Sequence, residues 1–129
     1  MLQLSNAFTN KKVLSLHNGG VIGQANEPVI NPENLKIEGW FSDSKLHDEE
    51  CIVLVQDVRE YTKDGLIVNS HEALTLPEDL VRLKNVLSIR FELIGKKVVT
   101  ENKTRRGTIT DYAINSDNMM VQKLYVDPP

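Results

Sequence analysis

Five basic side chains form the one concentration of positive charge in the sequence, between residues 96 and 106. They are Lys96, Lys97, Lys103, Arg105 and Arg106. We expect them on two adjacent strands and the turn between these strands, where they would form a patch able to bind phosphate groups. The alternative is a set of solvated charges, because lysines also protect the edges of sheets. No aromatic platform for stacking accompanies them, which favours the solvated charges.

The other residues that could bind a ligand or take part in catalysis are explained by local structure. Three histidines lie in separate predicted turns or loops, without the convergent spacing of a metal site: His17, His47 and His71. Gly19, Gly20 and Gly23 suggest a phosphate-binding loop, but no helix follows to supply its N–H groups. A hairpin turn followed by a strand glycine explains these three residues. We therefore predict no metal, no cofactor and no enzyme activity.

Composition restricts the class of protein. The chain has 129 residues, 40% of them hydrophobic, and a net charge of −3, which gives no general attraction to nucleic acid. The single cysteine, Cys51, begins an apolar run and is predicted to be a buried structural thiol. No apolar segment approaches the roughly 20 residues of a membrane helix. With no signal-peptide pattern, the expected location is the cytoplasm.

An internal repeat is the main organisational feature. Lys11–Ser15 matches Lys96–Thr100 at an offset of 85, and Ile30-Asn31 matches Ile114-Asn115 at an offset of 84. One residue is therefore missing from the second copy, in a polar stretch where a turn absorbs it. Asn10 aligns with Gly95, and Asn and Gly are the two residue types that most readily adopt a positive φ. We conclude that one supersecondary unit is built twice.

Short strands dominate the predicted secondary structure. Alternating apolar residues predict half-buried strands at Leu87–Leu93 and Leu35–Phe41, each with one solvent-facing side. The uninterrupted run Cys51–Val55 predicts a central strand covered on both faces, and Leu66–Val68 predicts a further short strand. A capping box at Thr75 and a leucine face predict one helix, over about Leu76–Asn85.

The repeated motif itself predicts two equivalent hairpins. Asn31–Asn34 and Asn115–Asn118 each begin with an Asn whose side chain can accept a hydrogen bond from a backbone N–H two residues later. Pro32 suits the second turn position, and Asn34 tolerates a left-handed backbone. Both turns join a strand that ends in Ile to a strand that starts at Leu35 or Met119.

The order of these features resembles the PRC-barrel family, named for the photosynthetic reaction-centre H subunit and including the C-terminal domain of the ribosome maturation factor. The resemblance is carried by "KKVLSLHNGGVIGQANEPVIN…LKIEGW", an apolar strand and "DVREYTKDGLIVNS". Residues 7–70 resemble the whole module, and residues 91–126 resemble only its first half. The resemblance implies small, bent antiparallel β-barrels that dock other macromolecules, with no shared catalytic residues.

We therefore expect a mainly β chain of two tandem PRC-barrel-like modules, residues 1–73 and 86–129, joined by a helix within residues 74–85. The second module is expected to lack its closing strands. Its last strand would then have one uncovered face, either Met119, Val121 and Tyr125 or Met120, Leu124 and Val126. Such a half-core favours association, with a further segment or with another copy in a homo-oligomer.

Two functions from different classes follow from this architecture. The first is a non-catalytic adaptor or scaffold that binds a protein partner through its strands and loops. The second is an RNA- or ribosome-associated assembly factor, by likeness to the ribosome maturation factor. We favour the adaptor, because the chain is acidic overall and its basic patch has no accompanying aromatic residues.

Overall fold

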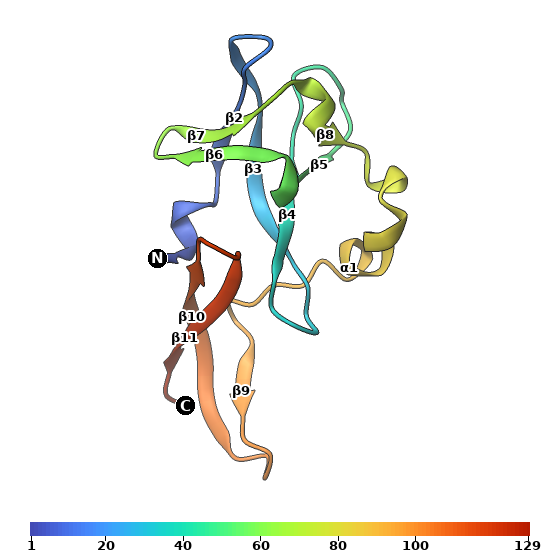
Figure 1. Cartoon of the computed structure of the whole chain (residues 1–129). Helices are drawn as coiled ribbons and strands as arrows, with labels where there is room; N and C mark the ends of the chain where they lie inside the picture. The colour runs from blue at the N-terminus through green and yellow to red at the C-terminus, as the bar shows by residue number, and fades with distance from the viewer.

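The computed structural model describes residues 1–129 and confirms the mainly β fold class. Strands hold 49% of the residues, and there is one short α-helix (Figure 1). No helix of the chain has the length and apolar character that crossing a bilayer requires.

Seven strands form the larger sheet, in the order β6, β7, β2, β3, β4, β5, β8. Their bounds in chain order are β2 (Lys11–Ser15), β3 (Gly20–Ile30), β4 (Ile37–Ser42), β5 (Cys51–Leu54), β6 (Val58–Thr62), β7 (Gly65–Val68) and β8 (Leu74–Thr75). The strands β6 and β8 are the two ends of this sheet and do not pair with each other, so the sheet is not a closed barrel.

Four strands form the smaller sheet, in the lower part of Figure 1. They are β1 (Leu2–Leu4), β9 (Lys97–Val99), β10 (Arg105–Asn115) and β11 (Met120–Asp127). The long strand β10 pairs with β11 along one edge and with both β9 and β1 along the other. Short 3₁₀ turns lie elsewhere, at η1 (Ser5–Ala7), η2 (Val55–Asp57) and η3 (His71–Ala73).

The two copies of the sequence repeat form the same three-stranded unit, β2-β3-β4 and β9-β10-β11. Val13 pairs with Gly23 in the first unit, and the equivalent Val98 pairs with Gly107 in the second. Four further pairs of β3 and β4 recur in β10 and β11 at an offset of 84: Ala25–Ser42, Pro28–Trp40, Val29–Gly39 and Ile30–Ile37. The predicted repetition of strand order and hairpin placement is confirmed at the level of strand register.

Both predicted hairpin turns are present, with one difference in their backbone. The side chains of Asn31 and Asn115 each accept the expected bond from the backbone N–H two residues on, at 3.0 and 2.9 Å. The left-handed residue is Leu35 in the first turn and Met119 in the second, each with φ 58°, whereas Asn34, which could tolerate this conformation, does not adopt it. Each turn is one residue longer than a β-turn, because the first Asn carbonyl accepts from the N–H four residues on, at 2.7 Å in both turns.

The tips of the two hairpins pair with each other. Ile37 N–H donates to the Met119 carbonyl at 2.9 Å, and Val121 N–H donates to the Leu35 carbonyl at 3.0 Å. Leu35 is equivalent to Met119 in the repeat, and Ile37 is equivalent to Val121. The two bonds are therefore related by a local pseudo-two-fold axis between the units. This contact joins the larger sheet to the smaller one.

One hydrophobic core of 17 buried residues extends through both units. It includes Val13, Trp40 and Val53 from the larger sheet and Tyr112 and Ile114 from the smaller sheet. The predicted central strand is confirmed, because all four residues of β5 are buried. The core therefore reaches the second unit through the hairpin tips as well as through β10.

The segment between the two units differs from its prediction. In place of a helix over Leu76–Asn85, the chain forms two 3₁₀ turns, η4 (Pro77–Asp79) and η5 (Val81–Leu83), followed by the α-helix α1 (Lys84–Ile89). The predicted strand Leu87–Leu93 is also wrong, since its first part is helical and its remainder is outside the sheets.

A second, smaller core explains this difference. Leu83 is buried with four side chains on the outer face of the larger sheet: Val29, Phe41, Ile52 and Leu54. Leu80, Val86 and Leu87 pack against the same group. The 3₁₀ turns and α1 thus cover this face, on which Phe41 is 4% exposed. The solvent-facing side predicted for Leu35–Phe41 is wrong at Trp40, which is 0% exposed in the main core.

Candidate interaction surfaces

The predicted basic patch lies at the far end of the smaller sheet. Lys97 is on β9, Arg105 and Arg106 are on β10, Lys103 is in the turn between them, and Lys96 immediately precedes β9. All five side chains are exposed, and none of them is in an ion pair. The patch therefore presents five free positive charges, on the strands and the turn where the sequence placed them.

One aromatic ring borders this patch, which the sequence analysis missed. The Lys96 ammonium lies 5.4 Å from the centroid of the Phe91 ring, within the range of a cation–π contact. Phe91 is partly buried against the core. A single, partly covered ring is a weaker platform for bases than the several exposed rings of typical single-strand-binding surfaces.

Arg90 organises the surface between the two units. Its guanidinium forms a bidentate ion pair with Glu50, at 2.7 and 2.9 Å, and lies 3.5 Å from Glu27. It also stacks 3.9 Å from the Phe41 ring centroid. The hydrogen bond from Arg90 lowers the pKa of the Glu50 carboxyl, and the same bond raises the pKa of Arg90. Arg90 adopts a left-handed backbone, with φ 49°, where α1 ends.

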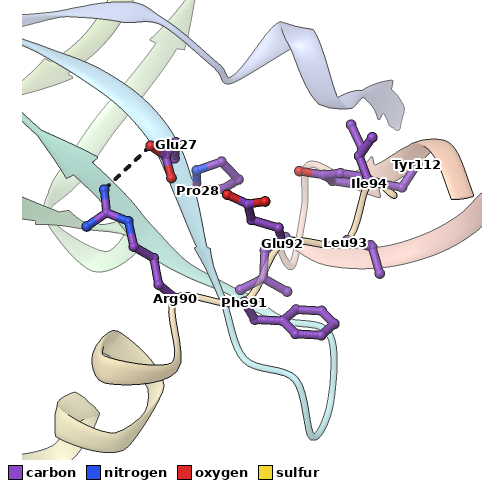
Figure 2. A pocket seen from close by; sticks show the side chains of 9 residues that line it. Glu27, Pro28, Arg90, Phe91, Glu92, Leu93, Ile94 and Tyr112 are labelled. Carbon is purple, nitrogen blue, oxygen red and sulfur yellow. Dashed lines mark hydrogen bonds and ion pairs between the residues drawn. The ribbon is translucent and has the colours of Figure 1, made fainter. Parts of the chain in front are cut away.

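A shallow cavity of about 270 Å³ adjoins this arginine (Figure 2). It is lined by Glu27, Pro28 and Ile30 of β3, by Arg90–Ile94, and by Tyr112 of β10. Burial, and secondarily the charge of Asp111, raises the pKa of Tyr112 to about 12. Figure 2 shows Arg90 turned toward Glu27, with its guanidinium already engaged. The cavity therefore suits a small apolar group, and its nearest cation is held by carboxylates.

The outer edge of β11 carries three consecutive exposed apolar residues. Leu124, Tyr125 and Val126 are 40%, 44% and 36% exposed. The equivalent residues of β4 are at most 4% exposed, since β5 pairs with β4 and the two cores bury Trp40 and Phe41. Met119, by contrast, is 2% exposed beneath the hairpin tips. The uncovered surface predicted for the second unit therefore begins beyond Val121.

The other titratable groups are distant from one another. His17, His47 and His71 are all exposed, and no group of acidic, His or Cys side chains is arranged to hold a metal ion. Cys51 is buried, and burial is the main cause that raises the pKa of its thiol, with Glu49 and Glu50 adding to it. Burial also raises the pKa of Tyr61 to about 12.

The sequence contained a signal for two of these surfaces, the basic patch and the exposed edge of β11. The exposed edge of β11 follows from aligning the repeats, because the first copy continues into a covering strand. Arg90 has no comparable signal, since its partners Glu27 and Glu50 are 63 and 40 residues away.

No protein-family model matches the chain, and no curated protein matches its sequence.

Proposed function

We propose that this chain is a non-catalytic adaptor of the PRC-barrel type, with two tandem modules of which the second is incomplete, and that it binds a protein partner. The observation that carries the proposal is the exposed apolar stretch Leu124–Val126 on β11, at positions that are buried in the first unit. An apolar surface next to a well-packed core is typical of a protein–protein interface.

The charged residues support the same function. The best-formed polar cluster, Arg90 with Glu27 and Glu50, is an ion-pair network at the surface, with each side chain 40–52% exposed. Its single guanidinium pairs with two carboxylates, one on β3 and one immediately before β5. Such a network holds the end of α1 against the larger sheet.

Affinity capture tests the adaptor function. The full chain is immobilised and exposed to a nuclease-treated lysate of its source organism, and retained proteins are quantified against an unrelated β protein of similar charge. We expect one stoichiometric protein partner that survives nuclease treatment. Loss of every specific partner after nuclease treatment would contradict the proposal.

The five free cations favour a second candidate, the RNA- or ribosome-associated factor. If the patch binds RNA, the double variant Arg105→Ala/Arg106→Ala weakens binding and lowers the slope of log K against log salt by about 1 to 2. The matched control is Lys45→Ala/Lys63→Ala, two exposed lysines outside the patch. Equal RNA binding by both double variants would exclude this function for the patch.

A further inference from the structure

We propose that the outer edge of β11, at Lys123–Val126, binds an extended strand of a partner protein, which adds antiparallel to the smaller sheet. This inference rests on the proposed protein-binding function and specifies its site and its mode. Strand addition at a sheet edge is an established mode of peptide recognition, in which backbone hydrogen bonds supply affinity and side-chain pockets supply specificity.

The molecule contains its own template for this contact. In the first unit, β5 pairs antiparallel with β4 through four residue pairs: Gly39–Leu54, Trp40–Val53, Phe41–Ile52 and Ser42–Cys51. The equivalents of these β4 residues are Lys123–Val126 of β11. Because β3-β4 and β10-β11 share one register, the edge of β11 presents the same backbone geometry that β5 occupies on β4.

The edge of β11 is free where the template predicts a strand. Its inner edge pairs with β10, and its outer edge is engaged only at its start, where Val121 N–H donates to Leu35. No strand pairs with the outer edge from Gln122 to Asp127. Lys123 is the one charged residue between Met120 and Val126, so this edge has little of the charge that usually prevents strand addition.

The two faces of β11 define the chemistry of the incoming strand. Leu124 and Val126 pair with Tyr112 and Ile109, which belong to the core, so the residues opposite them must be apolar. In the template, the residue opposite Trp40, which is equivalent to Leu124, is the apolar Val53.

The intervening residues of β11 alternate to the other face. Lys123 favours an acidic residue opposite it, and Asp127 favours a basic one. Tyr125 favours a β-branched residue, as Ile52 is in the template. The partner strand is therefore apolar at the three positions opposite Leu124–Val126, with charges at its ends that complement Lys123 and Asp127.

A synthetic probe follows from this register. It is the peptide Glu49–Asp57 with three changes: Cys51→Val, Glu50→Lys to face Asp127, and Leu54→Glu to face Lys123. The control peptide has the opposite charges, with Glu50 retained and Leu54→Lys. A second control carries backbone N-methyl groups, which remove the N–H donors that strand addition needs.

The experiment measures binding to the isotope-labelled full chain by NMR and amide hydrogen exchange. We expect the probe to bind more tightly than about 1 mM, to protect amides within Lys123–Val126, and to bind at least tenfold more tightly than either control. Leu124→Asp should weaken binding at least tenfold, whereas Leu16→Asp, at a side chain 61% exposed in the β2–β3 turn, should leave it unchanged.

Three results would overturn the inference. They are no binding of the probe, binding without protection of the β11 amides, and light scattering that shows a dimer dissociated by Leu124→Asp, since the occupant would then be a second copy. Capture of the same partner by wild type and Leu124→Asp would also overturn it while leaving the adaptor function intact. Capture of no partner would contradict the adaptor function, whereas strand addition at the edge of β11 is decided by the peptide experiment.

Discussion

Arg90 joins three segments that are remote in the sequence. It ends α1 in a left-handed conformation, pairs with Glu50 and Glu27, and stacks on Phe41. A non-glycine residue with positive φ costs free energy, and the bidentate ion pair and the ring contact offset that cost. The arginine thereby fixes the direction in which the chain leaves α1 toward the second unit.

The ion pair between Arg90 and Glu50 gives stability that depends on pH. The pKa of Glu50 is lowered from its ordinary 4.5, so its stabilising contribution is present above that value and is lost as the pH falls through the lower native pKa. We expect Glu50→Gln to cost up to about 1 kcal/mol near pH 7, because the pair is half exposed, and progressively less as the pH falls below 4.5. Urea unfolding at several pH values measures this cost. The control is Glu49→Gln, and a cost that is independent of pH would contradict the assignment.

Glycines at equivalent strand positions set the packing of both three-stranded units. A Cβ on Gly23 would collide with the Asp43 carbonyl, and a Cβ on Gly107 would collide with the Asp127 carbonyl. The second pair is the equivalent of the first in the repeat, at the offset of 84. Gly107 also has φ 135°, which other residues rarely adopt. Each unit therefore needs glycine where its middle strand passes close to its last strand.

We expect Gly23→Ala and Gly107→Ala each to destabilise the protein by about 1–3 kcal/mol, through backbone displacement and strain. Gly20→Ala is the control, because nothing lies within 4 Å of the added Cβ. Thermal unfolding of the three variants measures the effect. A neutral result at Gly23 would show that the strands separate there without cost.

Local features of these elements were predictable and long-range ones were not. Neighbouring residues determine three of the predicted features. These are the Asn turns, the positive φ at the aligned positions Asn10 and Gly95, and the close approach at Gly23. The alternating pattern of Leu87–Leu93 fits a strand as well as it fits a helix. Only the burial of Leu83 beside Val29 favours the 3₁₀ turns and α1 over a strand. The same limit explains why Arg90 was missed as the centre of the surface between the units.

Across the whole molecule, the pseudo-two-fold contact joins two units whose strands have different neighbours. The first unit has β5 on its outer strand and α1 on its outer face, whereas the second has β1 on β10 and an open edge on β11. The shared core and the reciprocal hydrogen bonds at the hairpin tips make the second unit depend on the first. We therefore expect the chain to unfold in one cooperative transition.

Ile114→Ala tests this dependence. Ile114 is 1% exposed in the second unit, and its truncation should cost about 2–5 kcal/mol by leaving a cavity. Trp40, the single tryptophan, is buried in the first unit, so its fluorescence reports the part of the same core that the first unit contributes. We expect Ile114→Ala to lower the denaturation midpoint measured by Trp40 fluorescence as much as that measured by exchange of β10 amides. Ile94→Ala, at a side chain 49% exposed in the same unit, should shift neither midpoint appreciably. If only the β10 amides respond to Ile114→Ala, the two units unfold independently despite their common core.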